Sequence, residues 1–569
     1  MNFSKTWHEW TPWLTLLMGL TAFWIWAGAY TLAPGHIGWV MSGIDTPTHY
    51  LGWQFFRHSS WWQWPLGKNP ADGSDAPGSI VMSDSIPLLA LLFKVFSAWL
   101  PRDFQYFGLW ALSCFLLQAW FARKLLARLT RDPVICLAGT GFFLGATVFL
   151  LRVYMHPALS AQWVLIAGMY LIFDARFRSR AWLLLLCITV LVHAYLFVML
   201  AAIWAGDIAQ RCWRREYPAQ KMLMHAGSAI ASVVLLMWAA GYFSKGAVLA
   251  ASIRGHLDLF FFLWTGIRYF GEWSSFLPGS NMDLLAYDGF GYLGAGFLVL
   301  LLMAVASSVL RIMRKTPETI VDGGPLSRWI VLIVICSILF IYALGNKVYL
   351  KQHLIFSYGI PAWLDHVYEV FRAPARMMWP GWYLLLFSVF YLLLKTIPLR
   401  YLRCIVVAAL LLQLADLSRA ALDIRAWAAK NRSWHSTMAA PLWAELASHY
   451  QHVAYLLPAS VPVGMVAFMP SYRAVGEYAA TNGMSLNIAY LARVDDQKMA
   501  AARAVRIALL SRGRAEPGTF YVIEDDSLWK QLLCVPDSTF WFGRVDGLKV
   551  IVPTSVPGLG KLPRDTCGA

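Results

Sequence analysis

Apolar runs separated by short polar or basic segments fill the chain up to about residue 417. Runs of this length cross a hydrocarbon core as helices. The pattern predicts a mainly α, polytopic membrane protein with about eleven transmembrane helices. The spans cover residues 12–34, 104–126, 133–151, 159–173, 182–193, 195–209, 222–242, 290–310, 329–344, 379–394 and 401–417. The two short spans on either side of His193 can also form one broken hairpin.

The pattern changes in the last part of the chain. Strands are predicted at 452–458 and 518–523, helices at 497–511 and 527–533, and a hairpin over 540–553 around Val545-Asp546-Gly547. This mixture predicts a small α/β domain over residues 420–569, which is long enough to have its own core. Residues 1–419 are then the transmembrane module.

Composition supports the membrane assignment. Hydrophobic residues make up 59% of the 569 positions and charged residues only 14%, and the mean hydropathy is +0.54. The net charge of +16 comes mostly from basic clusters in the loops, at 123–131, 176–180, 211–221, 311–315 and 395–403. These loops lie on one side of the predicted topology, and the positive-inside rule assigns that side to the cytoplasm. Such short, divided clusters are typical of anchors at lipid headgroups, so no nucleic acid is expected as a partner.

The opposite face carries the long loops, at 36–84, 244–288 and 345–378, followed by the tail. A helix over 86–100 is expected to lie in the membrane interface. The N-terminus is predicted to be cytoplasmic and the domain 420–569 periplasmic, in a bacterial inner membrane. No ATP or nucleotide sugar is available on that side, so a group transfer would draw on an activated donor in the membrane, such as a polyprenyl-linked sugar.

Two carboxylates in the first exported loop are the main catalytic candidates. Asp45 comes just after the first span, where an ionisable group needs a partner or a task. Asp84 precedes Pro87 and is equally well explained as a helix cap or as a functional group. His49, which follows Asp45 closely, is a candidate for substrate binding.

A second constellation, Arg372 and Arg376, precedes the tenth predicted span. Four residues apart, they share one face if the segment is helical, and guanidinium groups bind phosphate oxygens through two hydrogen bonds. Contact with lipid headgroups is the alternative explanation. Lys351 and His353 are further candidates for the donor phosphate. Candidates for substrate binding on the same face are Arg152, His156, His193, Arg268 and Glu272.

The eight cysteines follow the predicted topology. Only Cys534 and Cys567 fall in the exported tail, and an oxidising compartment favours a disulfide between them. No spacing of cysteine and histidine indicates a zinc site, so no metal ligand is assigned.

These features together resemble the GT-C superfamily of polyprenyl-phosphate-dependent glycosyltransferases. The segments 45–50, 64–70, 83–94, 105–110, 287–294 and 371–376 also resemble a bacterial family of multispan proteins of uncharacterised function. The GT-C resemblance implies that the acid of the first loop is the catalytic base, which corresponds to Asp45 and less closely to Asp84. Several relatives have two adjacent acids where this chain has Asp45-Thr46, so a divalent metal, Mg²⁺ or Mn²⁺, stays open as a cofactor.

The expected function is therefore transfer of a sugar from a polyprenyl-phosphate donor to a glycan, lipid or protein acceptor outside the cytoplasm. Two alternatives remain at this point. A flippase or transporter for lipid-linked glycans would also be multispan, but it should have a polar track through the bilayer. A non-catalytic envelope-assembly protein would explain the tail without explaining why carboxylates and arginines share one face.

Overall fold

The computed structural model describes residues 3–567 except 245–256, 268–270, 278, 280, 283, 315–320, 322–323, 459–460, 462, 536–538, 554–555 and 558. The chain is mainly helical and divides into two compact units. The helical unit comprises Met1–Ala33, Tyr106–Val234 and Ala250–Lys430. The sheet unit comprises Pro34–Gln105, Leu235–Leu249 and Asn431–Ala569.

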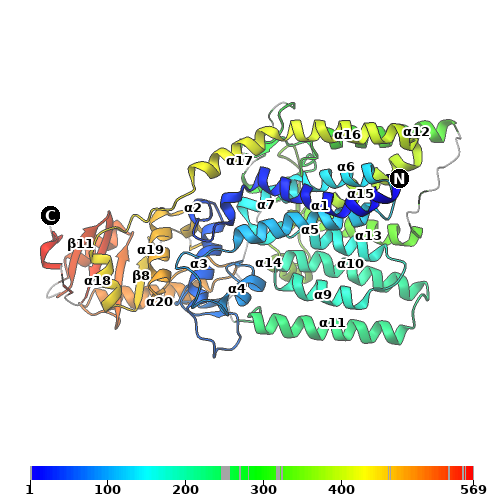
Figure 1. Ribbon diagram of the computed structural model, residues 1–569. Coiled ribbons are helices and arrows are strands. Elements are labelled where there is room, and N and C mark those ends of the chain that lie inside the picture. The colour runs from blue at the N-terminus through cyan, green and yellow to red at the C-terminus, as the bar shows by residue number, and fades with distance from the viewer. Residues whose placement is uncertain are drawn as a thin grey trace. The chain divides into compact units, whose positions relative to one another are not determined.

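The helical unit is a bundle of helices packed around α5 and α15 (Figure 1). Helix α5 contacts α1, α6 and α8, while α15 contacts α12 and α13. The helices are α1 (Phe3–Trp26), α5 (Phe107–Leu126), α6 (Pro133–Leu144), α7 (Thr147–Met155), α8 (Trp163–Ile172), α9 (Ser179–Val190), α10 (Ala194–Trp213), α11 (Ala219–Ala240), α12 (Ala295–Arg314), α13 (Leu326–Ala343), α14 (Ala362–Val370), α15 (Trp379–Thr396), α16 (Leu399–Asp416) and α17 (Ser418–Lys430).

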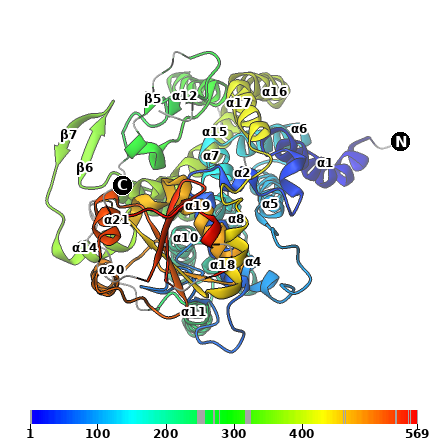
Figure 2. The same cartoon turned by 90° about the vertical axis from the view of Figure 1, so that its left-hand side faces the viewer.

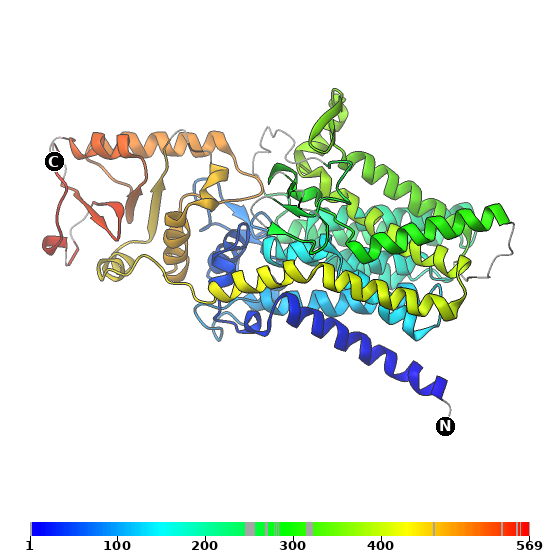
Figure 3. The ribbon, with the colours of Figure 1, turned by 90° about the horizontal axis from the view of Figure 1, so that it is seen from above.

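Several of these helices are suited to a membrane. Among the described residues, five segments are long and apolar enough to cross one, and they are Phe107–Leu126, Ala219–Ala240, Ala295–Arg314, Leu326–Ala343 and Pro374–Thr396. The number rises to seven if each of the bent pairs α6–α7 and α16–α17 is one span, and Figure 3 shows the second bend. The sequence-based count of about eleven also included shorter apolar helices such as α9.

Small sheets occur in the connections of the helical unit. Strands β3 (Gly266–Ile267), β4 (Gly271–Glu272) and β5 (Asn281–Met282) form one sheet in the order β4-β3-β5. Strands β6 (Lys347–Leu350) and β7 (His353–Ser357) form an antiparallel hairpin that stands out in Figure 2. Both sheets fall within the predicted second and third exported loops.

The sheet unit contains a five-stranded mixed sheet in the order β11-β12-β10-β8-β9. The parallel strands β8, β9 and β10 pair in register, with His452 opposite both Ser485 and Thr519. The strands are β8 (His452–Leu456), β9 (Ser485–Leu486), β10 (Thr519–Ile523), β11 (Trp541–Val545) and β12 (Leu548–Val552). The accompanying helices are α18 (Leu442–His449), α19 (Pro470–Thr481), α20 (Asp496–Leu510) and α21 (Asp526–Leu533). The two strands, two helices and hairpin expected in the tail are all present.

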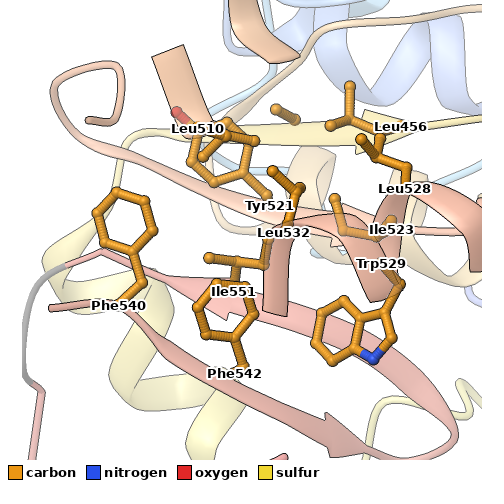
Figure 4. Packing of buried hydrophobic residues seen from close by; sticks show 11 residues of the cluster. Leu456, Leu510, Tyr521, Ile523, Leu528, Trp529, Leu532, Phe540, Phe542 and Ile551 are labelled. Carbon is orange, nitrogen blue, oxygen red and sulfur yellow. The ribbon is translucent and has the colours of Figure 1, made fainter. Parts of the chain in front are cut away.

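Apolar side chains from the sheet and from α20 and α21 form the core of this unit (Figure 4). Trp529 of α21 packs edge to face on Phe542 of β11, and Ile551 of β12 is fully buried beside them. Cys534, which caps the C-terminal end of α21, forms a disulfide with Cys567.

Residues Pro34–Gln105, called the first loop from here on, include the predicted loop over 36–84 and belong to the sheet unit rather than to the helical unit. They contain α2 (Gly38–Met41), α3 (Thr46–Arg57), β1 (Lys68–Asn69), β2 (Gly78–Ser79) and α4 (Pro87–Lys94). Helix α3 packs on α19, and a β-bridge joins Asp72 to Leu486. The compact units therefore do not follow the expected single division at 419/420, because long-range contacts attach this loop to the tail.

The expected interfacial helix over 86–100 is shorter in the structure, since α4 ends at Lys94. Arg57 accounts for the ending, because its guanidinium donates to the backbone carbonyls of Ser97, Leu100, Pro101 and Arg102 and holds that segment as turns. The Asp84 cap is also wrong: the N-cap residue of α4 is Ile86, and no side chain caps the helix.

Candidate functional site

Two buried arginines share one buried aspartate in the helical unit. Arg152 lies in the last turn of α7, Asp288 in the 3-10 turn Leu284–Gly289, and Arg376 in the 3-10 turn Pro374–Met378. Nη1 of Arg152 is 2.9 Å from Oδ1 of Asp288. Nε of Arg376 donates to Oδ1 at 2.9 Å and its Nη2 donates to Oδ2 at 3.2 Å. The three side chains are 1%, 8% and 11% exposed in the order Arg152, Asp288, Arg376.

Prolines and local turns place these groups. Pro157 follows His156 directly, so α7 ends at Met155 and leaves Arg152 in its last turn. Pro374 begins the 3-10 turn that carries Arg376, and Pro380 lies in the first turn of α15 just after it. Each arginine is thereby fixed at the end of a helix.

Aromatic rings surround the two guanidinium groups. The guanidinium carbon of Arg152 lies 5.2 Å from the ring centre of Trp379 and 5.5 Å from that of Tyr287. The same carbon of Arg376 lies 4.9 Å from the ring centre of Tyr195. Cation–π contacts of this kind favour a charged guanidinium in a place with little water.

Two histidines adjoin this cluster. The rings of His156 and His193 pack edge to face with their centres 5.2 Å apart. Nδ1 of His193 accepts a hydrogen bond from the backbone N–H of Tyr195 and so caps α10. His156 interacts electrostatically with both Arg152 and Arg376. The cluster therefore combines two fixed cations with two imidazole rings.

Among the described ion pairs of the helical unit, the charges of this cluster do not balance. Two guanidinium groups pair with one carboxylate, which leaves a formal surplus of one positive charge in a buried place. Burial raises the pKa of Asp288, but the positive charges of Arg376 and Arg152 outweigh it and hold that pKa below its ordinary value. Asp288 is therefore ionised at neutral pH, and the site is suited to a further anion.

The structure brings four of the predicted site residues together, namely Arg152, His156, His193 and Arg376. The expectation that Arg372 and Arg376 share one helical face is wrong. Helix α14 ends at Val370, and the next turn begins only at Pro374, so Arg372 lies in the irregular segment between them. Arg372 is half-buried and acts electrostatically on Tyr195, whose hydroxyl accepts from the N–H of Ala373.

Other candidates lie elsewhere in the helical unit. Lys351 and His353 lie on the exposed β6–β7 hairpin, where Asp258 accepts from the backbone N–H of Lys351 and fixes the turn. Glu272 forms an ion pair with Arg419. The described contacts join none of these groups to the arginine cluster. Arg268 lies outside the described residues.

Asp45, His49 and Asp84 lie in the sheet unit. Asp45 is the N-cap residue of α3 and is half-buried. Its side chain accepts no capping hydrogen bond from the helix. A ring nitrogen of His49 lies within 4.8 Å of a carboxylate oxygen of Asp84. The hydroxyl of Ser85 donates to the backbone carbonyl of His49 at 2.7 Å. Asp84 is thereby held beside the first turn of α3.

The backbone around Asp84 is strained. Asp84 and Ile86 both have φ near 52°, a left-handed conformation that is costly for a β-branched residue. Gly52 of α3 allows the close approach, because a Cβ there would lie 2.2 Å from Oγ of Ser83. Strain of this kind is common at functional sites, so Asp84 stays a candidate site residue.

The Asp84 carboxylate is the kind of ligand that Mg²⁺ and Mn²⁺ prefer, whereas the imidazole of His49 is typical of softer metals. Within the sheet unit these two side chains are candidate ligands of a divalent ion.

Asp288 and Tyr195 were missed as site residues. In the sequence, the stretch 287–294 contributed only to a family resemblance, and its aspartate was not a predicted site residue. The chain has only 31 acidic residues against 47 basic ones, so a lone aspartate at the start of a span is a signal that could identify Asp288.

The fold and the buried cluster define a multispan membrane protein with a second, sheet-containing unit and a candidate anion site. The chain belongs to the DUF6311 family: the model of this domain of unknown function matches residues 16–418, and the DUF6311 C-terminal domain matches residues 442–553. No curated protein and no solved structure matches the chain.

Proposed function

We propose that this protein is a glycosyltransferase of the bacterial inner membrane that takes a sugar from a polyprenyl-phosphate-linked donor. The acceptor is a glycan, lipid or protein hydroxyl on the periplasmic side. The new bond joins the acceptor oxygen to the anomeric carbon, and the bond from that carbon to the phosphate oxygen breaks. The acceptor's proton passes to the carboxylate of Asp45.

The observation that carries the proposal is the buried surplus of positive charge at Arg152, Asp288 and Arg376. A phosphate group would balance that charge and would accept hydrogen bonds from two guanidinium groups. Such donors also stabilise negative charge that grows on the leaving phosphate. The surrounding apolar helices provide an environment in which a polyprenyl chain is soluble.

Asp45 is assigned as the general base, an assistance worth roughly two to four orders of magnitude in rate. Asp45 is half-buried at the N-terminal end of α3, and its carboxylate is the kind of group that accepts a proton from a hydroxyl. Asp84 is assigned to orient the acceptor, and with His49 it would hold a Mg²⁺ or Mn²⁺ ion. Such an ion would supply positive charge to an anionic ligand bound by these two side chains.

The test follows glycan product and copurified lipid for two kinds of variant. Asp45→Asn keeps the size and hydrogen-bonding capacity of the side chain but cannot act as a base at neutral pH, so product should be lost while the polyprenyl phosphate still copurifies. Arg376→Ala should reduce both, because it removes a phosphate partner from the ground state and the transition state. Arg400→Ala, which removes an arginine from a predicted cytoplasmic loop, is the matched control and should change neither.

The outcomes separate the alternatives. Full product from well-expressed Asp45→Asn would overturn the assignment of the base. If Arg376→Ala loses the lipid while Asp45→Asn still supports product, a flippase for lipid-linked glycans is favoured. If neither variant has an effect and no lipid copurifies, an envelope-assembly role is favoured.

A further inference from the structure

Large apolar side chains are exposed along two segments of the first loop. Trp62 is 96% exposed, Trp99 79% and Trp64 65%. The exposed set, called the tryptophan patch below, comprises Trp61, Trp62, Trp64, Leu66, Leu92, Val95, Phe96 and Trp99. An apolar surface of this kind on a protein marks contact with a partner or with lipid.

Two buried cations join the segments into one surface. Nζ of Lys94, at the end of α4, donates to Oγ of Ser59 at 2.6 Å and lies 5.3 Å from the ring centre of Trp61. Arg57 donates to the carbonyls of Ser97 and Leu100. Residues 57–61 and 94–100 are therefore held together, and Lys94 serves as an internal link rather than as a surface charge.

The patch continues onto the end of a candidate membrane span. Trp64 stacks on Trp238 in the last turns of α11, with ring centres 5.3 Å apart. The N–H of Gly67 donates to the carbonyl of Ala239, and Oγ of Ser79 donates to that of Gly241. Gly67 is needed for this approach, because a Cβ there would lie 2.0 Å from the carbonyl oxygen of Ala240.

These contacts join the patch to the last turns of α11, of which the residues from Leu235 onward belong to the sheet unit. Helix α11 is 22 residues long and apolar enough to cross a membrane, and a spanning helix ends near the boundary between hydrocarbon and headgroups. Tryptophan prefers this boundary, where its ring is apolar and its N–H reaches polar groups. Trp64 and Trp238 lie at the end of α11, and the rest of the patch is continuous with them.

We propose that the tryptophan patch is a membrane anchor that inserts into the headgroup region of the leaflet at the Ala240 end of α11. The anchor is independent of the glycosyltransferase assignment. It would hold the segment that carries Asp84 and α4 at a fixed height above the bilayer. The occupant of the patch is phospholipid, not a second copy of the chain or another protein.

A photoreactive side chain provides the test. Benzoylphenylalanine replaces Trp62 or Trp99 in the full chain, and the membranes are irradiated before the protein is purified for mass spectrometry and gel analysis. Both replacements should give phospholipid adducts. Ile338→benzoylphenylalanine on α13, in a candidate span, is the positive control, and Val505→benzoylphenylalanine, an exposed apolar position on α20, is the negative control.

Two results would overturn the proposal. One is a discrete protein–protein band at position 62 or 99, which would identify a second copy or another protein as the occupant. The other is an absence of lipid adducts at both positions while position 338 is labelled. Membrane abundance and the melting temperature of each variant establish that the protein is folded, since both replaced side chains are exposed.

Discussion

Replacing Asp288 tests whether the arginine cluster is an anion site or only a structural ion pair. In Asp288→Asn the carboxylate charge is lost, and Arg152 and Arg376 keep a neutral neighbour of the same shape. Their side chains are 1% and 11% exposed, so water screens them little. Breaking a buried ion pair by removing one partner costs about 3–5 kcal/mol. Purified Asp288→Asn should therefore have a clearly lower melting temperature than the wild type.

The same variant should gain from an anion. Its surplus rises from one positive charge to two, so a lipid phosphate should bind it more tightly than the wild type. A ligand that binds only the folded state stabilises it by about 2.7 kcal/mol at a hundred times its Kd. Polyprenyl phosphate added in detergent should thus restore much of the lost stability. The melting temperature, measured across a range of lipid concentrations, gives the apparent Kd for both proteins.

Asp207→Asn is the matched control. Asp207 is also fully buried in the helical unit and pairs with Arg211 at 2.7 Å, with further hydrogen bonds from Trp182 and Gln210. This variant should lose comparable stability and regain none with the lipid phosphate. Equal rescue of both variants would mean a nonspecific lipid effect. Destabilised Asp288→Asn without any rescue would refute the anion site.

Two further predictions concern pH and topology. Burial raises the pKa of Asp72 from 3.8 to about 7. Between about pH 4 and about pH 7 the folded protein therefore keeps a proton that the unfolded chain releases. The folded state loses stability as the pH rises through this range. Asp72→Asn should therefore have the same melting temperature as the wild type near pH 4 and a higher one at pH 8. The gain in free energy of unfolding at pH 8 is at most about 4 kcal/mol. Equal melting temperatures of the two proteins at both pH values would contradict this prediction. A reporter active only in the cytoplasm and fused after Ala569 should be silent, because the basic clusters predict that the tail lies outside the cytoplasm. A strong reporter signal would reverse the proposed orientation.

Local patterns in the sequence predicted two strands, two helices and the hairpin of the tail, but not α18, α19 or β9. The strand over 518–523 is β10, and the hairpin turns at Asp546-Gly547, where both residues have positive φ. Positive φ at a turn is a local property that residue types reveal. The attachment of the first loop to the tail was not predictable, because it depends on pairings such as Asp72 with Leu486 that no local pattern encodes.

Only part of the candidate site could be predicted, because the rest depends on contacts between residues that are distant in sequence. Arg376 could be predicted, because guanidinium groups just before a span are suited to binding a phosphate. Asp288 was not predicted, because its importance comes from two arginines that are distant in sequence. The predicted pairing of Arg372 with Arg376 is wrong, because a four-residue spacing brings two side chains together only in a helix. Pro374 prevents a helix from running through this segment.

Charge balance distinguishes the Asp288 cluster from the other buried ionic network of the helical unit. In that network Asp174 also has two arginine partners, Arg128 and Arg178, but these are 27% and 46% exposed, so water solvates their surplus charge. Arg211, which is fully buried there, is satisfied by Asp207, Glu216 and two backbone carbonyls. Only at Asp288, among the ion pairs described in this unit, is the surplus itself buried. A buried surplus has no structural benefit of its own, so a ligand that neutralises it is the simplest reason for it to be there.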